Sequence, residues 1–369
     1  MSRIQLCALW AAWTAAAVAA GPAVAQDAVS GGNGTFYIST YRRATYVIPE
    51  STMAVASKLP FDAGLPVGIT LSYRRTRLYA EDAHFERFRV YDVPRGRLVD
   101  SFHLSRGNTR VRIMGFGLDP LERFAVMLIK TTKRLPDRFE IGPPRLVRYD
   151  LAKHVVLDTI PWPKGEEREG AGFQFSPDGK YMYLFGDDIL VYETEKFTVV
   201  DRWLLSRPLQ EGTGRFGFGF PESFYEEPGY YTGLFRMTDP VQNRRIMGIA
   251  RVNLAAKSVD FYALGPDEPV GFTLAPDRKK AYGLKQRVGT YEFWTFDLET
   301  RRVTARTPFP GRPRMQLLTS TNGRLLYVIG AGSTIDLYDA ATLRHLRTVT
   351  LDSDMLDVIL VPPPAPSQR

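Results

Sequence analysis

A pair of alternating polar and apolar runs occurs seven times along this chain of 369 residues. In each copy, one strand-like run ends at an acidic or polar turn and a second run follows it, which is the pattern of an antiparallel hairpin. The copies span residues 45–61, 88–104, 146–162, 189–205, 249–265, 293–309 and 335–351. The repetition predicts a fold built from one antiparallel unit used seven times.

The spacing of the turns gives the length of that unit. Measured at Pro49, Asp92, Asp150, Glu193, Asn253, Asp297 and Asp339, successive copies are 43, 58, 43, 60, 44 and 42 residues apart. A four-stranded propeller blade takes roughly 40–50 residues. A more apolar pair of runs precedes the hairpins, for example 172–176 and 181–185 around Pro177-Asp178-Gly179. We therefore predict an all-β fold, a seven-bladed β-propeller of four-stranded antiparallel blades over residues 35–362.

Blade one is one strand short at the start of the chain, because only residues 35–39 precede its outer hairpin. The apolar run 355–361 supplies the missing strand. We predict that this C-terminal run becomes the innermost strand of blade one and closes the ring, which leaves neither terminus with an unpaired sheet edge.

The N-terminus has the pattern of an export signal. Arg3 precedes an apolar stretch, and Ala23-Val24-Ala25 gives an A-x-A cleavage site. We predict a signal peptide over 1–25, a flexible segment over 26–34 and a disordered tail over 363–369. The expected location is the periplasm, without membrane attachment after cleavage; the alternative is an N-terminal membrane anchor.

Composition excludes several kinds of site. The single cysteine, Cys7, lies in the predicted signal, so the mature chain has no disulfide, cysteine-ligated metal or c-type haem attachment. We expect no cofactor in this chain. The net charge of +8 is spread without a concentrated basic tract, which disfavours nucleic acid as a partner.

Four long insertions indicate a recognition surface. They span 131–144, 163–171, 206–215 and 237–244, and blade connectivity places all four on one face of the ring, over blades three to five. Aromatic residues gather near them. The candidate partner-binding residues are Phe139, Phe216, Phe218, Tyr225 and Tyr230. For the alternating run 216–220, the other interpretation is ordinary packing between blades.

No catalytic or metal-binding constellation stands out. The histidines His84, His103, His154 and His345 are dispersed, and no G-x-S-x-G or G-x-x-x-x-G-K motif occurs. Two acidic clusters, Asp187-Asp188 and Glu166-Glu167 with Glu169, have the chemistry of calcium or acid–base sites, but solvated loop charges are the more ordinary explanation. We assign no catalytic, cofactor-binding or metal residue.

The repeat style resembles YVTN-type propellers, through the inner turn 176–180 (SPDGK) and the outer turn 338–342 (YDAAT). More narrowly, essentially the whole mature chain resembles the β subunit of bacterial quinohemoprotein amine dehydrogenase, a relative of the methylamine dehydrogenase heavy chain. The segments that carry this resemblance are 35–61, 134–150, 184–194 and 337–343.

The resemblance implies a noncatalytic propeller subunit. In that family a small subunit carries a peptide-derived tryptophylquinone that oxidises a primary amine, and a dihaem cytochrome-type subunit or a small carrier takes the electrons. The expected partners are thus a small quinone-bearing subunit and a cytochrome-type subunit, with the tryptophylquinone and the haem on those chains. No active-site residue of the family is carried over to a position in this sequence.

Two other functions stay open, because propellers host many unrelated activities. One is a hydrolase of the lactonase type, which would use acidic and basic residues at the channel mouth. The other is a scaffold that binds a peptide, a polysaccharide or an assembly factor. A pyrroloquinoline quinone propeller is disfavoured, since those enzymes are typically eight-bladed with a tryptophan at a repeated docking position. After the signal the only tryptophans are Trp162, Trp203 and Trp294.

Overall fold

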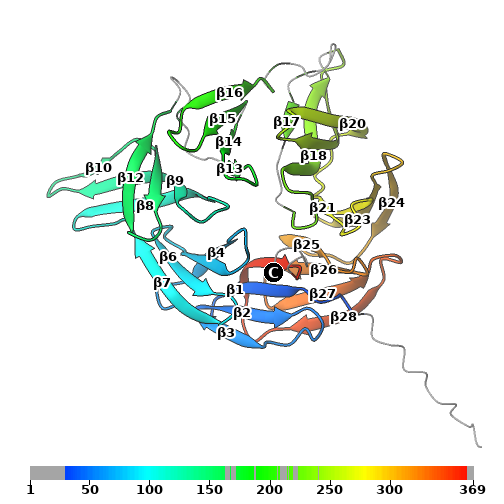
Figure 1. The fold of residues 1–369 in the computed structure, drawn as a ribbon. Helices are drawn as coiled ribbons and strands as arrows, with labels where there is room; N and C mark the ends of the chain where they lie inside the picture. The colour runs from blue at the N-terminus through cyan, green and yellow to red at the C-terminus, as the bar shows by residue number, and fades with distance from the viewer. Residues whose placement is uncertain are drawn as a thin grey trace, which may run out of the picture.

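Seven antiparallel sheets stand around a central axis in the computed structural model (Figure 1). The structure describes residues 30–162, 167, 172–186, 188–205, 207, 214, 216–218, 223–239 and 241–363. Throughout these residues the regular secondary structure is β-strand. The described part of the chain contains no helix with the length and hydropathy to cross a membrane. The predicted seven-bladed propeller is confirmed.

Each blade runs from an innermost strand, a, to an outermost strand, d. Blade one contains β29 (Met355–Val361), β1 (Thr35–Thr40), β2 (Ala44–Pro49) and β3 (Ser57–Pro60). Blade two contains β4 (Pro66–Leu71), β5 (Arg77–Asp82), β6 (Arg87–Asp92) and β7 (Arg97–His103). Blade three contains β8 (Thr109–Leu118), β9 (Ala125–Arg134), β11 (Arg145–Asp150) and β12 (Val155–Ile160), with β10 (Phe139–Ile141) added beside β9.

The remaining four blades have four strands each. Blade four contains β13 (Gly172–Phe175), β14 (Tyr181–Phe185), β15 (Ile189–Glu193) and β16 (Val199–Trp203). Blade five contains β17 (Phe216–Phe218), β18 (Tyr230–Asp239), β19 (Arg244–Asn253) and β20 (Ser258–Pro266). Blade six contains β21 (Thr273–Leu274), β22 (Lys280–Arg287), β23 (Thr290–Asp297) and β24 (Arg302–Pro308). Blade seven contains β25 (Met315–Thr319), β26 (Leu325–Gly330), β27 (Thr334–Asp339) and β28 (His345–Thr350).

The C-terminal strand closes the ring as predicted. β29 pairs antiparallel with β1, with Phe36 opposite Leu360 and Ile38 opposite Val358. All four side chains are buried. The last strand of the chain thus completes the first blade, and it is covered by β1 within the blade and by the neighbouring blade two.

The burial pattern follows from the ring. The b and c strands are buried on both faces because each blade is packed between two others; every residue of β26 is buried, for instance. The outermost strands face solvent, and β28 is almost wholly exposed. Aromatic side chains fill the spaces between blades, as where Phe36 meets Tyr327 edge-on with ring centres 5.0 Å apart.

The acidic residues that recur at the c–d turns have a local structural role. One carboxylate oxygen of Asp150 accepts backbone N–H groups two and three residues further on, at 2.9 and 2.8 Å. Asp339 does the same at 3.0 and 2.7 Å. These backbone hydrogen bonds hold the pKa of both carboxyls below the ordinary value. The repeated turn acids therefore stabilise hairpins.

Two faces of the ring differ by connectivity. The a–b and c–d turns lie on one face, the turn face. The b–c turns and the connections between blades lie on the other, the insertion face. Of the N-terminal segment 26–34, the structure describes 30–34, which contact blade seven on the turn face.

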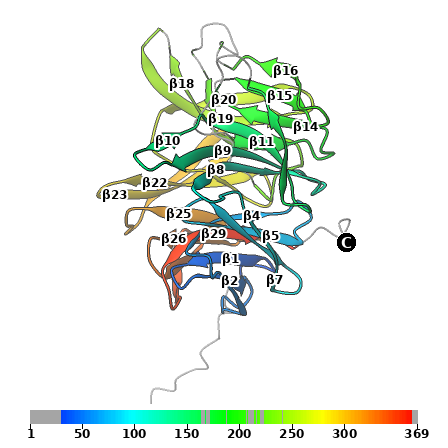
Figure 2. The same ribbon diagram turned by 90° about the vertical axis from the view of Figure 1, so that its left-hand side faces the viewer.

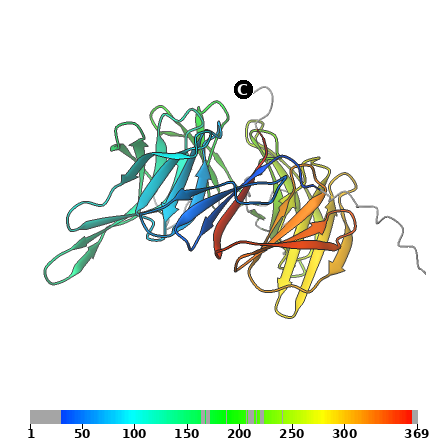
Figure 3. The ribbon, with the colours of Figure 1, turned by 90° about the horizontal axis from the view of Figure 1, so that it is seen from below.

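Blade three departs most from the common plan. Half of the expected insertion 131–144 is strand, since β9 extends to Arg134 and β10 pairs with its end, with Phe139 opposite Arg134. β8 is extended to match, with Thr109 opposite Lys133. The three strands form an arm that projects from the ring (Figures 1 and 2), and Figure 3 shows this blue-green hairpin at the left.

Candidate functional site

The arm of blade three presents apolar side chains to solvent on the insertion face. Phe139 is 68 % exposed and Ile141 is 65 % exposed. Because side chains alternate along a strand, both lie on the same side of β10. Their partners on β9 are Arg134 and Thr132. Phe139, predicted as a partner-binding residue, therefore lies where another protein can reach it.

A loop of blade five crosses the opposite end of the central channel. This loop, 223–229, belongs to the a–b connection and so lies on the turn face. The hydroxyl of Tyr225 donates a hydrogen bond of 2.9 Å to the carbonyl of Thr319 in blade seven. The ring of Phe224 contacts Arg75 in blade two. Blades two and five are three steps apart in a ring of seven, so the loop crosses the channel.

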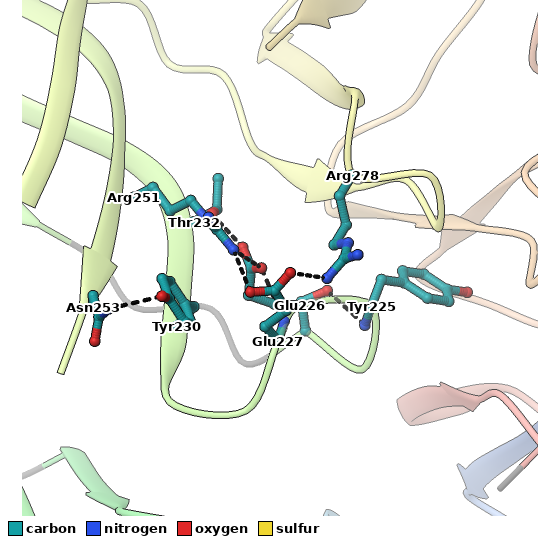
Figure 4. A network of polar contacts seen from close by, with 9 residues as sticks. Tyr225, Glu226, Glu227, Tyr230, Thr232, Arg251, Asn253 and Arg278 are labelled. Atoms are coloured by element: carbon teal, nitrogen blue, oxygen red, sulfur yellow. Dashed lines mark hydrogen bonds and ion pairs between the residues drawn. The ribbon is translucent and has the colours of Figure 1, made fainter. Parts of the chain in front are cut away.

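A polar network joins this loop to the strands of blade five (Figure 4). Arg251 donates to Glu226 at 3.0 Å and to Glu227 at 3.2 Å. Thr232 donates to the other oxygen of Glu226. Burial raises the pKa of Glu226, but these hydrogen bonds more than offset it, so its pKa lies below the ordinary value. Glu226 is therefore held as a paired carboxylate.

Tyr230 belongs to the same network. The guanidinium of Arg251 lies 4.1 Å from the centre of the Tyr230 ring, and Asn253 donates to the Tyr230 hydroxyl at 2.8 Å. Arg278 of blade six donates to Glu227 at 2.6 Å, which joins the two blades. A cavity of about 350 Å³ lies between blades five and six at this point. The charged groups that line it mostly neutralise one another.

A second cavity, of about 270 Å³, lies at the junction of blades seven and one on the insertion face. Met315, Ile329 and Met355 line it, together with Arg314 and Asp357. The carboxylate of Asp357 accepts the backbone N–H of Ile69 in blade two at 3.0 Å. Burial raises the pKa of Asp357. This carboxylate links two innermost strands across the blade boundary.

Glu81, near the insertion-face end of β5, is the carboxyl with the most unusual environment. Burial, and then the charge of the adjacent Asp82, raise the pKa of Glu81 from 4.5 to about 8. Its Oε1 atom is buried and makes no hydrogen bond within the described structure. A carboxyl that stays protonated near neutral pH has the property of a general acid.

Glu50 has the opposite character, since every contact it makes is structural. It is 1 % exposed and accepts hydrogen bonds from Gly34 N at 2.8 Å, Thr321 N at 2.9 Å and the hydroxyl of Tyr327 at 2.9 Å. The hydroxyl of Thr321 donates to it as well. Glu50 thus ties the c–d turn of blade one to the a–b turn of blade seven.

The described residues contain no group of three or more His, Cys, Asp and Glu side chains placed to hold a metal ion. Of the two acidic clusters, Asp188 is buried and pairs with Arg202 at 3.3 Å, and Glu167 is exposed. Asp187, Glu166 and Glu169 lie outside the described residues, as do the predicted signal peptide and most of the insertions 163–171 and 206–215.

The five predicted partner-binding residues do not form one surface. Phe139 lies on the insertion face, whereas Tyr225 and Tyr230 lie at the turn-face end of blade five, where they bond within the chain. Phe216 and Phe218 belong to β17, opposite Met237 and Phe235 on β18. Whether any of the five binds a partner stays a prediction.

Comparison with known proteins supports the fold and nothing narrower. No protein-family model and no curated protein matches the sequence. Among solved structures, a functionally unknown protein from Desulfotomaculum acetoxidans is 12 % identical, with a TM-score of 0.56 over 90 % of this chain and 100 % of that one. Dihydro-haem d1 dehydrogenase NirN is 13 % identical, with a TM-score of 0.51 over 90 % and 76 %. The periplasmic gluconolactonase PpgL of Pseudomonas aeruginosa is 13 % identical, with a TM-score of 0.50 over 90 % and 100 %.

At such identities the similarity shows a shared propeller and no shared activity. The resemblance to an amine dehydrogenase subunit accordingly remains a proposal.

Sequence reasoning missed Glu50, Glu81 and Asp357. None of them belongs to a motif, and Glu50 and Asp357 gain their environments from blades that are distant in the sequence. For Glu81 and Asp357, a carboxylate inside an otherwise apolar strand pattern was the available signal, because an acid there is buried when the blade packs. For Glu50, which follows a strand at a c–d turn, no such signal distinguishes it from the other turn acids.

Proposed function

We propose that this chain is an exported, noncatalytic propeller that holds partner subunits in a periplasmic complex. The observation that carries the proposal is the contrast between the two faces. On the turn face the channel is crossed by the loop 223–229, and the carboxylates Glu50 and Glu226 are fully engaged in structural contacts. On the insertion face an arm projects with exposed apolar side chains. Such a surface fits binding to another protein.

The complex proposed is a quinoprotein amine dehydrogenase. The resemblance over the whole chain supports this assignment, as does the expected absence of cysteine from the mature chain. The partners would be a small subunit that carries tryptophylquinone and a cytochrome-type subunit that carries haem. This chain would hold the two partner subunits in position relative to each other and would supply no group that reacts.

Purification from the native host tests the proposal. A tagged chain is expected to bring down two further chains in fixed ratio, one that stains for protein-bound quinone and one that stains for haem. The purified fraction should show quinone absorbance that bleaches when a primary amine is added. A monomer without quinone absorbance and without haem would contradict the proposal.

A hydrolase is the second candidate, and Glu81 is the observation that favours it. Glu81 is half-buried, its Oε1 atom makes no hydrogen bond among the described residues, and burial raises its pKa to about 8, which suits proton transfer near neutral pH. This function requires that the isolated recombinant chain hydrolyse a lactone or ester. The activity should be lost in Glu81→Gln. Absence of activity in the isolated chain would remove this candidate.

A further inference from the structure

We infer that the blade-three arm binds an acidic surface on a partner protein. The arm comprises residues 109–112 of β8 together with residues 130–145, which include the end of β9, β10 and their connections. This inference rests on the proposed scaffold function and names the surface through which the scaffold acts. The occupant is a protein with carboxylates around an apolar depression.

The arm is a small sheet with one mixed face. Directly paired residues of an antiparallel sheet share a face. Phe139 is opposite Arg134, and Ile141 is opposite Thr132, which is itself opposite Arg110. One face of the arm therefore places two large apolar side chains beside arginines. On the other face Val111 is buried against blade two, whereas Lys133 and Glu140 are exposed.

Positively charged residues strongly outnumber negatively charged ones in the arm. Its two segments contain seven Lys and Arg and only two Asp and Glu. Asp137 is already paired with Arg138 at 2.9 Å. Arg112, Lys133, Arg134 and Arg145 are exposed, and none of them forms an ion pair with a carboxylate among the residues that the structure describes. Arg112 and Arg134 share the face of Phe139 and Ile141, whereas Lys133 and Arg145 lie on the other face, opposite Glu140 and Ile129. Two uncompensated cations beside the apolar pair attract an acidic surface and orient it on approach.

The exposed apolar area indicates that charge is not the whole interaction. Two adjacent apolar side chains, each about two-thirds exposed, are costly on a surface that meets only water. Aromatic and apolar residues within a polar, arginine-rich rim are typical of the centre of a protein interface. We therefore expect Phe139 and Ile141 to enter a depression on the partner.

The position of the apolar pair favours a protein over a lipid surface. A loop that inserts into a membrane carries its apolar residues at the tip. In this arm the tip is Leu135-Pro136-Asp137-Arg138, and Asp137 is exposed there. Phe139 and Ile141 lie instead within β10, on the flat side of the arm. An anionic bilayer would meet the Asp137 carboxylate before it met either apolar side chain.

Photo-crosslinking in the native host locates the contact. The full chain would carry p-benzoylphenylalanine at position 139, and a control chain would carry it at position 288. Val288 is 91 % exposed and lies in the b–c turn of blade six, on the same face of the ring. We expect a crosslink from position 139 to the chain that co-purifies, and none from position 288. Equal crosslinks from both positions would overturn the inference.

Affinity measurements on the purified partner then test the chemistry. Phe139→Asp should weaken binding about tenfold or more, and Arg134→Glu, directly opposite Phe139, should also weaken it. Val288→Asp and Arg287→Glu are the matched controls and should bind like the wild type. Raising NaCl from about 50 to about 500 mM should weaken the wild-type complex, because salt screens the attraction between the cations of the arm and the carboxylates of the partner. An unchanged Kd for both arm variants would contradict the inference.

Two results separate this inference from the proposed function. If the partner carries no quinone but its binding needs the arm, the arm assignment holds and the amine dehydrogenase assignment fails. If a quinone-bearing partner binds the arm variants as tightly as the wild type, the amine dehydrogenase assignment holds and the arm assignment fails. Binding of the wild type, but not of Phe139→Asp, to vesicles of phosphatidylethanolamine and phosphatidylglycerol would assign the arm to a membrane and overturn the inference.

Discussion

The guanidinium carbon of Arg75 lies 5.3 Å from the centre of the Phe224 ring, which joins an inner turn of blade two to the loop that crosses the channel. The same guanidinium donates hydrogen bonds to the carbonyls of Pro362 at 2.6 Å and Pro363 at 3.2 Å, just after the ring-closing strand. One side chain thus connects three parts of the chain that are far apart in sequence. Arg75 therefore contacts both the segment that follows the ring-closing strand β29 and the loop 223–229 that crosses the channel.

We expect Arg75→Ala to lower the free energy of unfolding by about 1–3 kcal/mol, because it removes one cation–π contact and two hydrogen bonds to carbonyls. Urea denaturation of the mature protein measures this change. Arg74→Ala is the control, since Arg74 is the exposed neighbour in the same turn. Equal stability of the two variants would show that the Arg75 contacts contribute nothing.

Glu50→Ala should be more damaging than any surface substitution. It leaves the N–H groups of Gly34 and Thr321 and the hydroxyl of Tyr327 without an acceptor in a buried place. We expect a loss of about 3–5 kcal/mol of stability. Glu195→Ala removes an exposed carboxylate from another c–d turn and should change stability by less than about 0.5 kcal/mol. Thermal melts of both variants measure the two losses of stability. Equal melting temperatures for Glu50→Ala and Glu195→Ala would contradict the prediction.

The environment of Glu81 predicts a pH effect of definite sign. Folding raises the pKa of Glu81 from 4.5 to about 8, so the folded state holds the proton more tightly than the unfolded state. The stability from this group is complete below pH 4.5 and falls as the pH rises to about 8. Glu81→Gln imitates the protonated form of Glu81, so the stability of this variant does not fall with pH for that reason. We expect the variant to match the wild type near pH 4 and to exceed it by about 1–3 kcal/mol near pH 9.

Denaturation curves at several pH values check this prediction. Glu140→Gln serves as the control, because Glu140 is an exposed carboxylate on the arm. Its stability relative to the wild type should not change with pH. A constant difference between Glu81→Gln and the wild type across the same range would contradict the assigned environment.

Removal of residues 353–369 should cause a large loss of thermal stability, because it deletes β29 and exposes the edge of β1. Met355, Val358, Leu360 and Val361 are all buried between blades. Since the truncated chain can fail to fold, Val358→Ala gives a milder test, with an expected loss of about 1–3 kcal/mol. An unchanged melting temperature after truncation would refute the role of β29.

The repeat pattern was enough to predict the blades and the ring closure. Each hairpin depends on alternation and on a turn acid such as Asp150 or Asp339, whose hydrogen bonds reach only two or three residues along the chain. The exposed position of Phe139 was also predictable, because it follows from an insertion between two strands. The strand structure of that insertion was not, since β10 is only three residues long.

The sequence by itself determined the number of blades, their order and the strand that closes the ring, because these follow from local periodicity and from the need to pair every strand. Tertiary structure alone decided which side chains meet across the ring. The loop 223–229 crosses the channel only because closure brings Thr319 and Arg75 within its reach. In the same way Glu50 resembles the other turn acids in the sequence, and only the packing of blades one and seven makes it a structural tie. The strand around Glu81 indicates burial, but only the folded structure gives its carboxyl a raised pKa.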